Sequence, residues 1–223
     1  MGTLTDSLPK PLLMVGGKTL IEHVLDALPV SITDCVVVTG YRSGDIVSFL
    51  GTNYKGRPLS YTRQKHMGTG GALCSAKESL ANENLFLVVG ADDIFGTGEL
   101  DKLLGKTASY GITFGTPKMH SPYGIRFDEN GYLTGWHDNV PAATPRFYGV
   151  GAYVLPPKVF AESFHRLGNG EYSIPHSLPR QPFPVKTCLM EQWLPVNTPE
   201  DIANAEGVLG RQDWGTNSTA RNQ

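Results

Sequence analysis

A lysine between two prolines is the first group in this chain that could do chemistry. Lys10 lies between Pro9 and Pro11. Each proline fixes its own φ and biases the residue before it toward extended geometry, so we expect Leu8 and Lys10 to lie outside any helix. A stiff segment that presents one ammonium group at a set place suits an anionic ligand such as a phosphate. The alternative interpretation is a proline-rich connector with a solvated lysine.

Two acidic residues follow the strongest strand signal in the chain. Residues 85–90 form a short apolar run that ends in glycine and predicts a buried strand, and Asp92 and Asp93 come directly after it. In open α/β sheets ligands bind at the carboxyl ends of the strands, and carboxylate oxygens suit a hard cation such as Mg²⁺. A helix-capping aspartate is the alternative explanation.

A glycine-rich turn is the third candidate. The stretch from Gln64 to Leu73 includes Gly68 and Thr69, follows a predicted strand and opens a predicted helix. Small residues let the backbone approach a ligand, and the N–H groups at a helix start favour anions. A plain connection between a strand and a helix would explain the same residues.

The fourth candidate lies far along the chain, at the start of a predicted helix. Thr198 is a suitable cap, Pro199 fits the first helical position, and Glu200 and Asp201 face the positive end of the helix dipole. Asn197, just before the cap, could bring a second oxygen ligand to a cation. By itself the segment predicts only a capped helix.

The elements that must position these groups follow from periodicity. Strand-like apolar runs alternate with helical spacing, which favours an α/β fold with a mainly parallel sheet. The second half differs, with a hairpin over residues 122–136 and further strands, which we interpret as a β-rich lid. We predict one domain over residues 1–209 and a polar tail over 210–223. The other predicted strands are residues 35–40, 59–63, 111–115, 147–155 and 185–190, and the other predicted helices are 20–28, 43–50, 71–80, 100–104 and 156–164.

Composition limits the classes of function. The chain has 223 residues, 40% of them hydrophobic, and a formal net charge of -2, which gives no electrostatic case for binding nucleic acid or a membrane surface. Three cysteines lie far apart without metal-ligand spacing, no stretch approaches the length of a membrane span, and the start does not resemble a secretory signal. These features predict a cytoplasmic protein.

Taken together, the four segments resemble the nucleotidyltransferases that make nucleotide sugars, such as glucose-1-phosphate thymidylyltransferases. The resemblance runs from about Leu4 to Leu209 and includes the stretches 4–12, 68–72, 92–95, 123–125, 151–153 and 197–201. It implies a Rossmann-like mixed sheet flanked by helices. It also implies transfer of a nucleoside monophosphate from a nucleoside triphosphate to a sugar 1-phosphate, with release of pyrophosphate and with Mg²⁺ as cofactor. The partners would then be small molecules, and a homo-oligomer is compatible with the sequence.

The resemblance also implies a role for each matching residue. Lys10 would contact the phosphates. Asp92 and Asn197 would hold Mg²⁺. The nucleotide would lie against Gln64, Gly68 and Thr69, and the sugar against Gly124 and Asp138.

The chain departs from the family pattern at three places. Family members begin with a strand and a glycine-rich loop ending in arginine, and this match starts just after that point. Asn139 replaces a phosphate-binding lysine, and Pro195 stands where sugar thymidylyltransferases carry a metal-binding aspartate. We therefore keep two hypotheses open: an active sugar-phosphate nucleotidyltransferase that uses further upstream residues, and a non-catalytic ligand-binding or regulatory member. Transfer to another alcohol phosphate, such as choline phosphate, is a weaker third.

Overall fold

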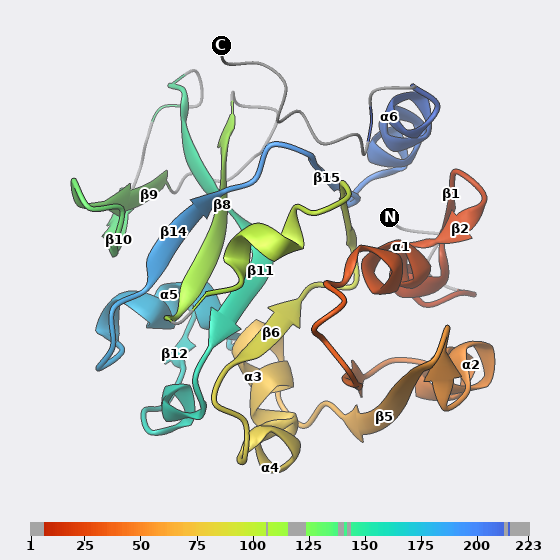
Figure 1. The fold of residues 1–223 in the computed structure, drawn as a ribbon, viewed down its shortest axis with the longest axis horizontal. Helices are drawn as coiled ribbons and strands as arrows, with labels where there is room; N and C mark the ends of the chain where they lie inside the picture. The colour runs from red at the N-terminus through yellow and green to blue at the C-terminus, as the bar shows by residue number, and fades with distance from the viewer. Residues whose placement is uncertain are drawn as a thin grey trace. The chain divides into compact units, whose positions relative to one another are not determined.

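The chain folds into two compact units. The computed structural model describes residues 7–105, 107–115, 124–137, 141, 144–211 and 214. Unit 1 combines the residues up to Tyr61 with Val89–Lys102 and the segment from Glu191 onward, and unit 2 combines Thr62–Val88 with Leu103–Met190. Each unit therefore joins segments that are distant in the sequence, as the colours in Figure 1 show.

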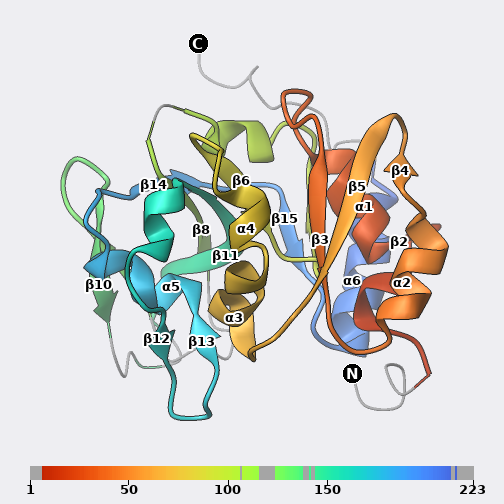
Figure 2. The ribbon, with the colours of Figure 1, turned by 90° about the horizontal axis from the view of Figure 1, so that it is seen from below.

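In its described residues, unit 1 contains three α-helices, two short 3₁₀ helices and several short strands. Strands β1 and β2, β4 and β5, and β7 and β15 pair in antiparallel fashion, and β3 joins β5 and β4 in a three-stranded sheet. Figure 2 shows α1 and α2 beside this sheet. The elements are η2 (Lys10–Leu12), β1 (Met14–Val15), β2 (Lys18–Thr19), α1 (Leu20–Ala27), β3 (Cys35–Thr39), α2 (Ser43–Leu50), β4 (Asn53–Tyr54), β5 (Arg57–Arg63), β7 (Asp93–Phe95), η3 (Leu100–Leu103), β15 (Trp193–Pro195) and α6 (Pro199–Leu209).

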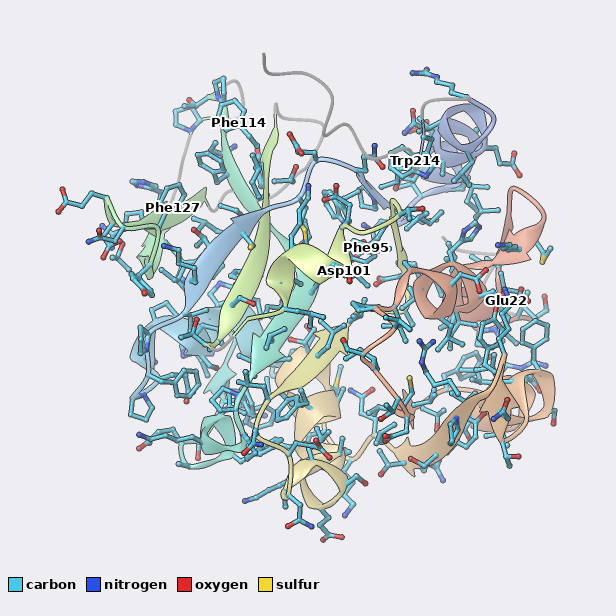
Figure 3. All side chains as sticks on the ribbon, in the orientation of Figure 1. Glu22, Phe95, Asp101, Phe114, Phe127 and Trp214 are labelled. Atoms are coloured by element: carbon cyan, nitrogen blue, oxygen red, sulfur yellow. The ribbon has the colours of Figure 1, made fainter. Side chains whose placement is uncertain are left out.

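Helix α1 shows how local sequence sets an element of unit 1. The Thr19 side chain accepts from the backbone N–H of Glu22, and the Glu22 carboxylate accepts from the backbone N–H of Thr19, which forms a capping box. Figure 3 labels Glu22 in this first turn. The apolar spacing that predicted the helix becomes a buried face made of Leu20, Ile21, Val24 and Leu25.

The buried face of α1 is shared between two cores of unit 1. Ile21 and Leu25 pack with residues of η2, α2 and β5, while Leu20 packs with Leu13, Val15, Ile94, Val196 and Ala205. The second core therefore contains residues from the start, the middle and the end of the chain.

Unit 2 is built on a four-stranded sheet in the order β14-β8-β11-β6. β14 runs parallel to β8 and β11 runs antiparallel to it, so the sheet is mixed. Two antiparallel hairpins, β9/β10 and β12/β13, complete the unit. Its elements are α3 (Gly68–Ser75), α4 (Lys77–Leu80), β6 (Phe86–Val89), β8 (Ser109–Gly115), β9 (Gly124–Phe127), β10 (Leu133–His137), β11 (Arg146–Leu155), η4 (Pro157–Phe160), β12 (His165–Arg166), β13 (Tyr172–Ser173), α5 (Ile174–Ser177), η5 (Leu178–Arg180) and β14 (Lys186–Leu189).

Aromatic rings stack within the core of unit 2. The rings of Tyr110 and Tyr153 stack with centroids 4.8 Å apart, and both residues are buried. At the edge formed by β8, β9 and β11, Phe147 contacts Phe114 and Phe127, which are labelled in Figure 3. Tyr110 and Tyr153 lie in one buried cluster with residues of α3, η4 and α5, so this unit has its own hydrophobic core.

The α/β fold with helices flanking strands, predicted from the sequence, is confirmed, while several local predictions are wrong. Residues 156–164 contain only the 3₁₀ turn η4 in place of a helix. Lys10 begins the 3₁₀ turn η2, contrary to the prediction that it lies outside helical structure. That turn is closed by Leu12 and Leu13, which donate their N–H groups to Pro9 and Lys10, so the N–H missing from Pro11 is not needed. Asp138 and most of the predicted tail lie outside the described residues.

A charge cluster joins α1 of unit 1 to the β4–β5 turn. The Asp26 carboxylate accepts from the ammonium groups of Lys18 and Lys55, each at 2.6 Å, and from the hydroxyl of Tyr54 at 3.0 Å. Burial by itself would raise the pKa of Asp26, but the three hydrogen bonds outweigh it and lower the pKa to about 2.

This cluster makes the stability of the fold dependent on acid pH. A carboxyl group whose folded-state pKa is depressed stabilises the protein above its unfolded-state pKa, and the stabilisation disappears as pH falls toward the folded-state value. We expect Asp26→Asn to lower the free energy of unfolding by about 1–2 kcal/mol near pH 6, after allowance for the exposed lysines. The difference from wild type should shrink between about pH 4 and pH 2. Urea unfolding across this range measures it. Asp34→Asn, at an exposed site, is the control. A difference in the free energy of unfolding between Asp26→Asn and wild type that does not change with pH would contradict the prediction.

Candidate functional site

The ammonium group of Lys10 holds two oxygen ligands from distant parts of unit 1. Its Nζ lies 2.7 Å from Oδ2 of Asp92 and 2.8 Å from Oδ1 of Asn197. Both oxygens therefore lie within one hydrogen-bond length of the same nitrogen. The Lys10 side chain is 24% exposed and that of Asp92 is 44% exposed, so the group is accessible from solvent.

Strand pairing places Asp92 beside Asn197. β15 runs antiparallel to β7 with Pro195 opposite Asp93, and Val196 extends the ladder by donating its N–H to the carbonyl of Asp92 at 3.1 Å. Asn197 is the next residue along this segment. The two side chains are thus brought together by backbone hydrogen bonds rather than by contact between themselves.

The N-terminus of α6 fixes the backbone at Asn197. Oδ2 of Asp201 accepts from the N–H groups of Asn197 and Thr198, each at 2.8 Å, and Thr198 accepts from the N–H of Asp201. This is the capped helix start that the sequence predicted, with Pro199 at the first helical position. The cap therefore does more than begin a helix, because it also orients the residue that carries the amide ligand.

A single apolar core anchors all three segments of the site. Leu13 follows the Lys10 turn, Ile94 follows Asp92, and Val196 precedes Asn197; all three are buried in the same cluster. Because each polar residue lies within three positions of a buried anchor, the core restricts where its side chain can reach.

The two adjacent acids lie in different surroundings. Asp93 opens strand β7 and is buried, while Asp92, in the preceding turn, pairs with Lys10. The sequence alone could not decide which of them would face outward.

The donor set fits magnesium. Carboxylate and amide oxygens are hard ligands, and those of Asp92 and Asn197 converge on one point. Pro195, at the position of the metal-binding aspartate of sugar thymidylyltransferases, lies in β15 and offers no side-chain ligand. Among the described residues, no group of three or more His, Cys, Asp or Glu side chains could hold a metal ion. A metal here would depend on two protein oxygens, with water and ligand oxygens completing its shell.

The predicted nucleotide-binding residues lie in unit 2, at the start of α3. Nε2 of Gln64 donates to the carbonyls of His66 at 2.7 Å and Gly68 at 3.3 Å, so this amide fixes the loop. The hydroxyl of Thr69 accepts from the N–H of Ile174 at 3.0 Å. These contacts give each residue a structural role, and the nucleotide-binding roles remain predictions.

The glycines of this loop are required by close backbone approach. A Cβ at Gly68, where φ is +83°, would lie 2.4 Å from the carbonyl oxygen of Tyr172, and one at Gly71 would lie 2.2 Å from that of His66. No side chain fits at either position without movement of the backbone. The loop is therefore packed against its own unit whether or not it also binds a ligand.

Of the predicted sugar-binding pair, only Gly124 is described. It opens β9 opposite His137, and the side chain of Arg146 packs over it. Arg146 is itself buried and donates to the hydroxyl of Tyr148 at 2.9 Å.

The structure thus brings Lys10, Asp92 and Asn197 together in unit 1, while Gln64, Gly68, Thr69 and Gly124 belong to unit 2. The sequence analysis did not foresee that the lysine would pair directly with both proposed metal ligands. It also missed Asp201 as the residue that holds the Asn197 backbone, although the acid three residues after Thr198 is a capping-box signal.

Comparison with known proteins identifies relatives. A family model described as nucleotidyl transferase matches residues 2–181. A bifunctional protein GlmU from Alkaliphilus metalliredigens is 25% identical over 94% of this chain and 50% of its own length. One from Methanococcus maripaludis is 28% identical over 58% of this chain and 29% of its own length. The chain thus spans half or less of the length of these relatives.

Solved structures share the fold. UDP-glucose pyrophosphorylase from Acinetobacter baumanii superposes with a TM-score of 0.74 at 19% identity, covering 94% of this chain and 89% of that one. A Bacillus anthracis protein, described as a glucose-1-phosphate thymidylyltransferase, gives 0.74 at 22% identity, covering 93% and 89%.

The chain belongs to the nucleotidyl transferase family, since the family model covers most of its length. The family model and the relatives support the sugar-phosphate nucleotidyltransferase branch, and the solved structures share its fold. None of the helices in the described ranges has the length and apolar character needed to cross a bilayer.

The packing of the α3 loop leads to a stability test. We expect Gly68→Ala to lower the free energy of unfolding by about 2 kcal/mol or more, because the new Cβ meets backbone and φ is positive. Gly44→Ala is the control: a Cβ at Gly44 of α2 would meet nothing within 4 Å, so it should be neutral or stabilising. Chemical unfolding of both variants measures this, and equal stability of the two would show that the contact at Gly68 is not restrictive.

Proposed function

We propose that this protein transfers a nucleoside monophosphate from a nucleoside triphosphate to a sugar 1-phosphate and releases pyrophosphate. The observation that carries the proposal is the convergence of the Lys10 ammonium with oxygens of Asp92 and Asn197. A cation on a stiff turn and two hard oxygen ligands at one place suit a reaction in which phosphate charge must be neutralised.

The reaction needs no nucleophilic side chain. A phosphate oxygen of the sugar 1-phosphate forms a bond to the α-phosphorus of the triphosphate, and the bond from that phosphorus to the oxygen bridging to the β-phosphorus breaks. Pyrophosphate leaves with the electron pair of the broken bond. The attacking phosphate monoester is largely dianionic near neutral pH, so no general base has to remove a proton.

Lys10 supplies positive charge and position. Its ammonium donates hydrogen bonds to phosphate oxygens and stabilises the negative charge that builds up around the α-phosphorus. The short 3₁₀ turn η2, which follows Pro9, contains Pro11 and is anchored by the buried Leu12 and Leu13, sets where the side chain starts. Lysine and phosphate are thereby oriented before reaction, which lowers the entropic part of the barrier.

Asp92 and Asn197 would hold Mg²⁺. When bound, that ion would neutralise phosphate charge and polarise phosphoryl oxygens as a Lewis acid. The role of the protein is to present the two oxygens together, and the β7–β15 ladder and the α6 cap do so.

Residues of unit 2 complete the proposal. Gln64, Gly68 and Thr69 would bind the nucleotide, with the Thr69 O–H still able to donate because its oxygen accepts from Ile174. Gly124 and Asp138 would lie against the sugar. Support comes from relatives that include a protein named UTP–glucose-1-phosphate uridylyltransferase AglF from Haloferax volcanii, 32% identical over 41% of this chain and 38% of its own length.

The test is release of pyrophosphate by the purified chain with Mg²⁺, a panel of nucleoside triphosphates that begins with UTP and dTTP, and a panel of sugar 1-phosphates that begins with glucose 1-phosphate. We expect turnover with at least one pair. Asp92→Asn and Lys10→Met should each lower kcat/KM about 10²- to 10³-fold, because each removes a group that stabilises transition-state charge. Asp101→Asn, at an exposed acid of η3 labelled in Figure 3, is the matched control and should leave kcat/KM unchanged.

Absence of pyrophosphate release across the whole panel would contradict the proposal. Binding of a sugar nucleotide without turnover would then favour the alternative, a non-catalytic ligand-binding or regulatory member of the family. The replacements at Asn139 and Pro195 motivate that alternative, since both remove side chains that the resemblance assigns to charge neutralisation.

A further inference from the structure

The Lys10 ammonium occupies the place at which the proposed metal site would hold its ion. It lies between Oδ2 of Asp92 and Oδ1 of Asn197, at 2.7 and 2.8 Å. A divalent ion bound to the same two oxygens would have to meet this nitrogen at close range. Two cations cannot share one pair of ligands at such a separation, because their repulsion is strong and is only partly screened.

We propose that Lys10 is an internal counter-ion that competes with the divalent cation, so that the metal binds weakly alone and enters the site together with the triphosphate. The inference rests on the proposed function for the assignment of Asp92 and Asn197 as metal ligands. It adds a second role for Lys10, as the residue that controls when the metal site is open.

The surroundings of Lys10 support an exchange rather than a permanent ion pair. Its backbone is held by the 3₁₀ turn and by buried leucines, but the side chain is a flexible stem that is 24% exposed. The nitrogen can therefore move away from the oxygens without unfolding the turn. Once it does, the negative charge of a triphosphate offers it new hydrogen-bond acceptors.

Asp201 already accepts two hydrogen bonds at the start of α6, from the N–H groups of Asn197 and Thr198 to its Oδ2, and Asp93 is buried in β7. An anion that arrives from outside favours departure of the ammonium from Asp92 and Asn197, because it offers the ammonium new acceptors. Metal and triphosphate binding are then coupled, and each must strengthen the other by the same factor.

The inference is tested with Mn²⁺ alone, as a magnesium substitute whose free form is counted by electron paramagnetic resonance. We expect Lys10→Met to bind Mn²⁺ roughly three- to tenfold more tightly than wild type, because the competing ammonium is gone. Lys18→Met removes the same charge from an ion pair with Asp26 elsewhere in unit 1, and it should leave Mn²⁺ affinity unchanged. Lys10→Arg keeps a cation and should stay closer to wild type. Lys10→Gln serves if the methionine variant does not fold.

Three comparisons decide the outcome. In the double variant Lys10→Met/Asp92→Asn the gain should disappear; a gain that persists would place the ion elsewhere and overturn the inference. Mn²⁺ affinity that is equal or lower in both Lys10→Met and Lys10→Gln would overturn it as well. With UTP or dTTP present the effect should reverse, so that Lys10→Met binds Mn²⁺ less tightly than wild type. If Lys10→Met still bound Mn²⁺ more tightly than wild type with the triphosphate present, the proposed exchange of ammonium for metal would be wrong.

The result is separable from the proposed reaction. Tighter Mn²⁺ binding by Lys10→Met, together with no pyrophosphate release by the wild-type protein, would keep the inference and count against the transferase proposal. Pyrophosphate release by wild type with no change in Mn²⁺ affinity between the variants would do the opposite.

Discussion

The antiparallel pairing of β7 with β15 is the constraint on which the candidate site depends. One backbone hydrogen bond beyond this pairing, from Val196 to Asp92, brings a side chain from the middle of the chain beside one from near its end. The pairing is held over an apolar core that Leu13, next to the Lys10 turn, also joins. Changes in that core would therefore move the side chains of Lys10, Asp92 and Asn197 together, although none of the three belongs to the core.

Charge distribution within unit 1 follows from the same arrangement. The Lys10 ammonium contacts one carboxylate and one amide oxygen, while the other described lysine ion pairs of the unit, at Asp26, Glu99 and Glu191, lie elsewhere. In the cap of α6, Oδ2 of Asp201 accepts from two backbone N–H groups. The described site therefore pairs one cation, Lys10, with one exposed acid, Asp92. A polyanionic ligand would compete with Asp92 for the ammonium, and a divalent ion would compete with the ammonium for Asp92.

Local pattern predicted the elements well where one signal dominated. The helical spacing after Lys18 and the Thr198 cap gave α1 and α6, and the apolar run at 85–90 gave β6. Prediction failed where two weak local effects competed. Pro156 and Pro157 fit a helix start, yet only one 3₁₀ turn forms there. The expected effect of Pro11 on Lys10 was outweighed by the hydrogen bonds that the N–H groups of Leu12 and Leu13 donate to the carbonyls of Pro9 and Lys10. Two-residue strands such as β1 and β2 left no pattern long enough to detect.

The sequence by itself determined the chemical types of the site: a stiffened lysine, an acid after a strong strand and an amide before a capped helix. These follow from residue identity and from neighbours a few positions away, which fix local geometry. Only the tertiary structure decided that Asp92 pairs with the lysine while Asp93 is buried, that Asn197 lies beside Asp92, and that the ammonium bridges Asp92 and Asn197. Those outcomes depend on strand register and on a shared core between residues far apart in sequence, and no local pattern encodes either.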